Sequence, residues 1–178
     1  MIIGIDFDDV LCETTEAVLQ VYNKRHGTFF SKQDVRGWDI AEQIGADEDE
    51  VEALFSDPEV WDVALPTSYA PQYLKKLDEE HEIYIITATY LNAVEPKFKW
   101  FKERFPFIEE EQIIICHEKQ LVDVDVFIDD GVHNMGDPED IGRCQVLFLT
   151  PWNKEYKSQF KTVTSLGEFY DFIKELEA

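Results

Sequence analysis

Cations are scarce in this sequence. Its 178 residues include 16 Lys and Arg against 38 Asp and Glu, which gives a formal net charge of −22 at pH 7. A surface of this sign repels the phosphate backbone of nucleic acids and anionic lipid headgroups. We therefore expect neither a nucleic-acid polymer nor a membrane as a partner. A small phosphorylated ligand fits only if a metal ion and a local lysine reverse the field inside one pocket.

Cysteine is also rare, and long apolar runs are missing. Cys12, Cys116 and Cys144 are odd in number and lack metal-site spacing, so we interpret them as reduced thiols of a cytoplasmic protein. The apolar runs are too short to cross a bilayer, and the first predicted strand begins at residue 2, which leaves no room for a signal peptide. With 44% hydrophobic and 13% aromatic residues, the chain is expected to form one compact domain, 1–178.

Short apolar runs in this sequence predict buried strands. They are rich in Ile, Val and Phe and do not alternate with polar residues, which is typical of strands covered on both faces. The runs are 2–7, 83–87, 112–116, 124–128 and 145–149. Helical patterns stand between most of them, at 15–26, 71–80, 94–105 and 165–176. This alternation predicts an α/β fold with a doubly wound, parallel, Rossmann-like sheet.

The alternation breaks after the first helix. Residues 31–69 carry no strand pattern but contain helical pieces such as 47–55. A long insertion after the first strand is usually a functional lid, so we expect a small helical cap within 15–69. Trp38 and Trp61 belong to it and could stack on a nucleobase, or they could simply bridge lid and core.

Two of the predicted strands run directly into acids. Asp6, Asp8 and Asp9 follow the first strand, and Asp129 and Asp130 follow the fourth. Ligands of open parallel sheets bind outside the carboxyl ends of the strands, where the two clusters would meet. Their mutual repulsion calls for a divalent cation, and oxygen-only ligands favour Mg²⁺. The alternative is a pair of solvated turns in which an acid caps the next helix.

Two further residues could hold a phosphate at the same edge of the sheet. Thr87 ends the second strand, and its hydroxyl and the backbone N–H groups beyond it could bind a phosphate oxygen. Lys119 lies on a short link after the third strand, ten residues before Asp129. Each also has an ordinary interpretation, as a strand-end threonine and as a surface lysine. We interpret His117 and His133 as packing or surface groups.

Taken in order, these residues resemble the four motifs of haloacid dehalogenase-like hydrolases. The matching residues are Asp6-Phe7-Asp8-Asp9-Val10, Thr87, Lys119 and Asp129-Asp130. Nearly the whole chain also resembles the 5'(3')-deoxyribonucleotidases and their bacterial and phage-type relatives. The stretches that carry this second resemblance are 8–11, 21–27, Trp38-Asp39, 83–88, 128–130, His133-Asn134 and Pro151-Trp152-Asn153.

The resemblance implies a magnesium-dependent phosphomonoesterase, with a nucleoside monophosphate as the expected substrate. Asp6 would be the nucleophile that becomes an aspartyl phosphate, and Asp8 would act first as acid and then as base. The metal ligands would be carboxylate oxygens and one backbone carbonyl, from Asp6, Asp8, Asp130 and, beside them, Asp129. The phosphate-binding residues would be Thr87, Ala88 and Lys119.

The sequence departs from the family pattern in ways that leave the substrate open. Asp9 stands where many relatives have glycine, and Ala88 replaces a serine of the animal enzymes. The aromatic base-binding residues of those enzymes have no clear counterpart here. A sugar phosphate or phosphoglycolate is therefore an alternative substrate. A non-catalytic nucleotide- or phosphate-binding module is an alternative of another class, against which Asp8 argues because binding alone needs no second acid there. The sequence predicts no oligomeric state.

Overall fold

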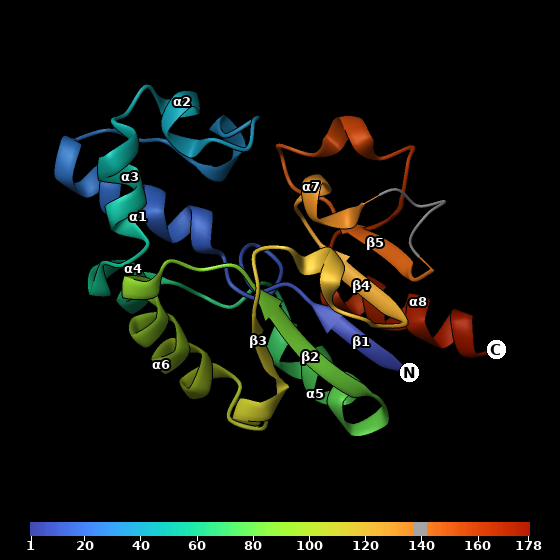
Figure 1. Ribbon diagram of the computed structural model, residues 1–178. Helices are drawn as coiled ribbons and strands as arrows, with labels where there is room; N and C mark the ends of the chain where they lie inside the picture. Colours follow the sequence, from blue (N-terminus) through green and yellow to red (C-terminus); the bar gives the residue numbers. More distant parts are fainter. Residues whose placement is uncertain (137–141) are drawn as a thin grey trace.

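A single parallel sheet forms the centre of the computed structural model, which describes residues 1–136 and 142–178 (Figure 1). Within these residues the sheet has six strands in the order β3-β2-β1-β4-β5-β6. They are β1 Ile2–Ile5, β2 Glu82–Thr87, β3 Ile113–Ile115, β4 Val126–Asp129, β5 Cys144–Phe148 and β6 Lys161–Val163. The order reverses beside β1, because the chain first builds outward to β3 and then returns to add β4 on the other side of β1. The predicted doubly wound α/β fold is confirmed.

The sequence patterns located five of the six strands and extended the first one too far. β6 was missed because it is three residues long at the edge of the sheet, and of its residues only Val163 is fully buried. β1 ends at Ile5 rather than at residue 7. Asp6 still donates its backbone N–H to the carbonyl of Ile128 at 2.9 Å, so the pairing with β4 ends at the first acid.

Helices cover the sheet and fill the insertion. The α-helices are α1 Thr14–His26, α2 Ile40–Ile44, α3 Glu48–Leu54, α4 Pro58–Val63, α5 Ala70–Glu80, α6 Val94–Arg104, α7 Val132–Met135 and α8 Leu166–Glu177. Figure 1 shows α1, α2 and α3 beyond the arrowheads of β1 and β2, at the carboxyl edge of the sheet. None of the described helices is long and apolar enough to cross a membrane.

The short helices of the insertion begin at aspartates. Asp39, Asp47 and Asp57 each occupy the N-cap of α2, α3 or α4, where the side chain accepts a hydrogen bond from a backbone N–H of the first turn. Gly27 and Gly45 end α1 and α2 in the left-handed conformation that favours glycine. Three of the acids of this segment therefore serve local helix formation.

The sheet buries side chains on both faces, which explains the unbroken apolar runs. On one face, strand residues such as Ile3 and Ile85 join the apolar sides of α5, α6 and α8. On the other face, Phe127 and Leu147 pack with Met135 of α7. The larger core extends into the insertion, because Trp61 of α4 lies 6.1 Å from the ring centroid of Phe7. The insertion is thus packed onto the residues that follow β1.

Candidate active site

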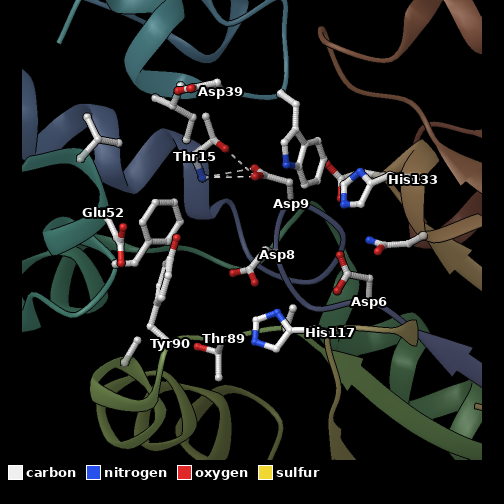
Figure 2. A pocket seen from close by; sticks show the side chains of 18 of the residues that line it. Asp6, Asp8, Asp9, Thr15, Asp39, Glu52, Thr89, Tyr90, His117 and His133 are labelled. Atoms are coloured by element: carbon white, nitrogen blue, oxygen red, sulfur yellow. Dashed lines mark hydrogen bonds between the residues drawn. The ribbon is translucent and has the colours of Figure 1, made fainter. Parts of the chain in front are cut away.

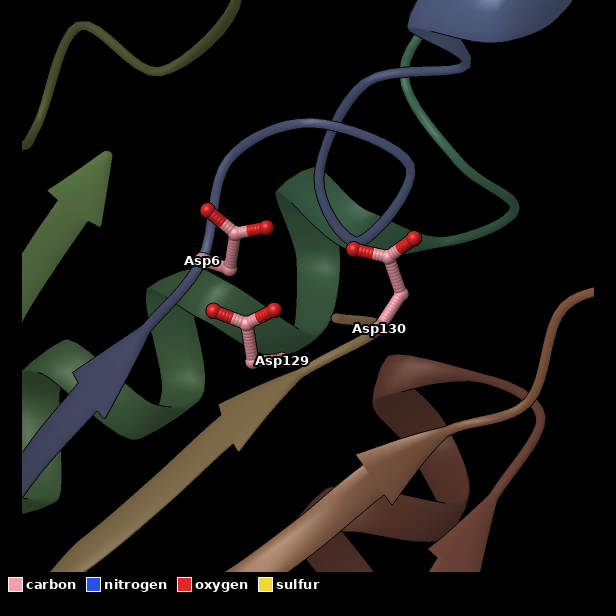
Figure 3. Close-up of side chains that lie close together, drawn as sticks. All are labelled: Asp6, Asp129 and Asp130. Atoms are coloured by element: carbon pink, nitrogen blue, oxygen red, sulfur yellow. The ribbon is translucent and has the colours of Figure 1, made fainter. Parts of the chain in front are cut away.

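Three aspartates meet at the carboxyl edge of the two central strands. Asp6 follows β1, Asp129 is the last residue of β4, and Asp130 follows it (Figure 3). Each offers an oxygen that lies within 4.8 Å of the others. All three side chains are buried, with 3%, 0% and 3% exposure. The two acidic clusters expected to meet in space do so, because parallel neighbours end at the same edge.

Lys119 is enclosed between two of these acids. Its Nζ lies 2.5 Å from Oδ1 of Asp6 and 2.8 Å from Oδ2 of Asp129. The side chain is only 3% exposed, so Lys119 is not a surface lysine. A buried ammonium is tolerated when carboxylates compensate its charge, as they do here.

The carboxylates outweigh this single ammonium. Burial and then the charge of Asp129 raise the pKa of Asp6 from 3.8 to about 7, against the opposing effect of Lys119. Burial, followed by Asp129 and Asp6, also raises the pKa of Asp130 well above its ordinary value. A hard divalent cation would relieve this repulsion, and a donor set made only of oxygens suits Mg²⁺. The residues present therefore fit the expected metal.

Asp129 and Asp130 differ in the oxygens they leave free. Both oxygens of Asp129 accept hydrogen bonds, from Asn134 Nδ2 at 3.1 and 3.2 Å and from the N–H of Gly131 at 2.6 Å, in addition to the contact with Lys119. Asp130 accepts one bond on Oδ2, from Trp152 Nε1 at 2.8 Å. Its Oδ1 accepts none from the residues that the structure describes. Asp130 is thus better suited to direct coordination, and Asp129 to orienting Lys119.

Asp8 lies beside this cluster and is held from two sides. Thr14 donates to Oδ1 of Asp8 at 2.8 Å, and Lys97 Nζ lies 2.5 Å from Oδ2. Lys97 also donates to Oγ1 of Thr87 at 2.8 Å. Sequence reasoning missed Lys97. The signal was its place on the buried stripe of α6, where Trp100 and Phe101 follow at the helical spacing of three and four residues.

Asp9 has a different role from its neighbours. Its φ is 59°, in the left-handed region where glycine is favoured and Asp is tolerated. This explains why Asp can stand where relatives have glycine. Its carboxylate accepts from the hydroxyl of Thr15 at 2.6 Å and pairs with Lys32 Nζ at 2.8 Å. The contacts of Asp9 with Thr15, at the start of α1, are those of an acid that caps the next helix, which was the alternative interpretation of the acidic turns.

A cavity of about 670 Å³ opens between the acids and the insertion. Figure 2 shows Asp6 and Asp8 on its core side, Glu52 and Tyr90 on the left and His133 on the right. Ala88 and Lys119 line it as well, whereas Thr87 is fully buried and does not line it. This volume is in the range of small-molecule sites. Five of the expected core residues therefore line one cavity: Asp6, Asp8, Ala88, Lys119 and Asp130.

The two tryptophans of the insertion differ in position, although both line the cavity. Trp61 is 5% exposed, packs on Phe7 and donates Nε1 to the carbonyl of Phe55, so it bridges the insertion and the core. Trp38 is 58% exposed and meets the ring of His133 edge-on at 4.3 Å. His133 thus packs against the insertion, as expected of a packing group, and also lines the cavity.

Comparisons with known proteins agree with this geometry. A family model described as 5' nucleotidase, deoxy (pyrimidine), cytosolic type C protein matches residues 1–178. A 5'(3')-deoxyribonucleotidase of Clostridium acetobutylicum is 31% identical over 153 residues, which cover 85% of this chain and 83% of that protein. One of Bacillus subtilis is 26% identical over 155 residues, 86% of this chain and 87% of that protein. A haloacid dehalogenase-like protein of Agrobacterium tumefaciens shares the fold, with a TM-score of 0.68 and 13% identity over 99% of each chain.

Proposed function

Because the chain belongs to the family of deoxy (pyrimidine) 5'-nucleotidases of cytosolic type C, a family of phosphoric monoester hydrolases, we propose that it hydrolyses nucleoside monophosphates through an aspartyl-phosphate intermediate. The observation that supports this best is the group of Asp6, Asp130 and Lys119 on the floor of one cavity, with Asp8 beside it. Binding of a phosphate alone would not need Asp8 at that position.

Asp6 is the proposed nucleophile. A carboxylate oxygen attacks phosphorus, the bond from phosphorus to the leaving oxygen breaks, and an acyl phosphate forms on Asp6. Lys119 supports this role, because its ammonium lies 2.5 Å from Asp6 and favours the ionised carboxylate despite burial. Dividing the displacement into two steps lowers the barrier of each.

Asp8 is the proposed acid–base group. It gives a proton to the leaving oxygen in the first step. In the second step it takes a proton from the water that attacks the acyl phosphate, which releases inorganic phosphate and restores Asp6. One carboxyl can serve both steps because they occur in sequence.

The remaining residues bind charge. Asp6, Asp130 and the backbone carbonyl of Asp8 would hold Mg²⁺, with Asp129 beside them. When bound, the ion neutralises negative charge on the phosphoryl oxygens. Thr87 would donate its hydroxyl to a phosphoryl oxygen, the backbone of Ala88 its N–H, and Lys119 its ammonium. Positioning and neutralisation are the main requirements of phosphoryl transfer.

The cavity wall supports a nucleoside as the leaving group. Aromatic rings of Trp38, Phe55 and Tyr90 line the insertion side, and stacking of a base on such rings is worth about 1–3 kcal/mol. Glu48 and Glu52 lie on the same side. An acidic wall disfavours a second phosphate, so monophosphates fit better than diphosphates. The relatives named as 5'(3')-deoxyribonucleotidases lead us to propose deoxynucleotides first.

The test is phosphate release from a panel of nucleoside monophosphates, hexose phosphates and phosphoglycolate, with Mg²⁺ and with excess chelator. We expect activity only with Mg²⁺, highest kcat/KM for a nucleotide, and no turnover by Asp6→Asn. A tenfold preference for a non-nucleotide would overturn the nucleotidase proposal and leave the phosphatase intact. Full activity in chelator, or in Asp6→Asn, would overturn the proposed mechanism.

A further inference from the structure

Lys97 is a charged residue at a position where the fold calls for an apolar one. It faces the core from α6 beside Trp100 and Phe101 and is only 2% exposed. Its Nζ lies 4.5 Å from the ring centroid of Phe7. Burying an ammonium costs free energy unless its hydrogen bonds are made, so a lysine at this position needs a compensating interaction.

The contacts of Lys97 join two residues of the proposed mechanism. Nζ donates to Oδ2 of Asp8 at 2.5 Å and to Oγ1 of Thr87 at 2.8 Å. The other oxygen of Asp8 accepts from Thr14 at 2.8 Å. The carboxylate of Asp8 is therefore held by both oxygens, from α1 on one side and from α6 on the other. This fixes its rotation at the edge of the cavity.

The bond to Thr87 also directs the threonine hydroxyl. Because Oγ1 accepts from Lys97, its single proton must point elsewhere. It points to the carbonyl of Ala88, at a long 3.3 Å. A long bond of this kind is readily exchanged for one to a phosphoryl oxygen. Lys97 thus leaves the hydroxyl proton of Thr87 free to be donated to an acceptor other than the ammonium.

We propose that Lys97 is a positioning residue that holds the acid–base group Asp8 in register with the phosphate-binding hydroxyl of Thr87. The inference rests on the proposed function, because it assigns Asp8 the proton transfers. A general acid works only within hydrogen-bond reach of the leaving oxygen. Lys97 sets this distance, because its ammonium contacts both Asp8 and Thr87, the residue proposed to bind the phosphate.

Two substrates that differ in their leaving group can distinguish a positioning role of Lys97 from a purely structural one. A nucleoside leaves as a poor alkoxide and needs a proton from Asp8, whereas p-nitrophenolate leaves without one. In Lys97→Met, rapid-quench measurements should show nucleoside release from a monophosphate slowed about 10²-fold or more. The same variant should also slow the pre-steady-state burst of p-nitrophenolate from p-nitrophenyl phosphate, but by a factor at least ten times smaller than the factor for nucleoside release. The turnover that follows the burst should be slow, because water attack also needs Asp8.

Matched variants separate the effects. Lys99→Met removes an exposed lysine from the same helix and should match the wild type with both substrates. Thr87→Val should slow the reactions of both substrates by a similar factor, since it removes a hydrogen bond to the phosphoryl group that the two substrates share. Lys97→Met keeps the length of the side chain but leaves Asp8, which is 29% exposed and reachable by water, without its cation, so some stability should be lost while the fold is retained. A single cooperative melting transition above the assay temperature would establish this.

A double variant tests whether Lys97 acts through Asp8. If it does, Asp8→Asn combined with Lys97→Met should lose little more than Asp8→Asn alone. Equal slowing of the two substrates by Lys97→Met, or independent losses in the double variant, would overturn the positioning role. Failure of the proposed function has a different signature, because Asp6→Asn would then stay active with both substrates.

Discussion

Removing the charge of Asp6 should stabilise the metal-free protein while abolishing turnover. Asp6 is 3% exposed, and its pKa is raised from 3.8 to about 7, first by burial and then by repulsion from Asp129. At about 1.4 kcal/mol per pKa unit, this difference sets an upper limit of roughly 4 kcal/mol on the cost of ionising Asp6 in the folded chain. Asp6→Asn keeps the shape of the side chain and removes that cost.

The pH dependence has a definite sign. The pKa of Asp6 is higher in the folded than in the unfolded chain, so the folded chain binds more protons between about pH 4 and pH 7. The contribution of Asp6 to stability is fully present below this window and is lost as the pH rises through about 7. Burial raises the pKa of Asp9 and Asp130 in the same direction. Metal-free wild type should therefore become less stable as the pH rises, and Asp6→Asn should show a shallower decline.

Urea unfolding at several pH values between about 5 and 8, in chelator and in Mg²⁺, measures this difference. In chelator at about pH 8, the free energy of unfolding of Asp6→Asn should exceed that of the wild type by about 1–4 kcal/mol. This difference should become smaller at about pH 5. Mg²⁺ should stabilise the wild type most at high pH and should affect Asp6→Asn less. Asp62→Asn, which neutralises an exposed acid of α4, is the control. The reasoning fails if Asp6→Asn is the less stable protein in chelator at high pH.

Three further predictions concern charge, packing and substrate. Lys119→Met should lower kcat by about 10²–10³, measured by phosphate release with Lys99→Met as the control, since it removes the cation beside Asp6. Trp61→Ala should cost about 3–5 kcal/mol in urea unfolding, whereas Trp38→Ala, at a site 58% exposed, should cost under about 1 kcal/mol and raise the KM of a nucleotide about fivefold or more. Nucleoside diphosphates should have a kcat/KM at least about tenfold below that of monophosphates, and Glu52→Gln should narrow this gap.

Each of these predictions has an outcome that contradicts it. Near-normal kcat in Lys119→Met would remove Lys119 from the phosphate site. Equal losses of stability in the two tryptophan variants would mean that Trp38 is packed as Trp61 is. Diphosphates hydrolysed as well as monophosphates would show that the acidic wall does not face the leaving group.

Local patterns predicted the sheet because its strands are covered on both faces. Continuous apolar runs result, and they end where acids begin, so the two acidic clusters could be placed at one edge of the sheet. β6 escaped because an edge strand of three residues buries too little to leave a pattern. Asp9 illustrates a different limit. Its left-handed φ and its pairing with Lys32 follow from the path of the chain between β1 and α1, which residue spacing does not reveal.

Lys97 could not be assigned a role from the sequence because its partner is remote. It lies 89 positions from Asp8, and the contact arises only when α6 packs beside the carboxyl ends of β1 and β2. The periodicity of α6 places Lys97 on the buried side but does not name its counter-ion. The same holds for the tryptophans of the insertion. Both are aromatic residues of the insertion, and only the packing of Trp61 on Phe7 distinguishes the buried tryptophan from the exposed one.

The charge balance of the site connects its chemistry to the acidity of the whole chain. Its lysines are all paired with acids: Lys32 with Asp9, Lys97 with Asp8, and Lys119 with Asp6 and Asp129. Asp130 adds a carboxylate that none of these ammonium groups contacts within the described residues. Five acids against three cations would repel a phosphate dianion, so the proposed substrate would need a divalent cation that reverses the local field. The formal net charge of −22 disfavours anion binding over the rest of the surface, so we expect a phosphorylated ligand at this cavity and no polyanion as a partner.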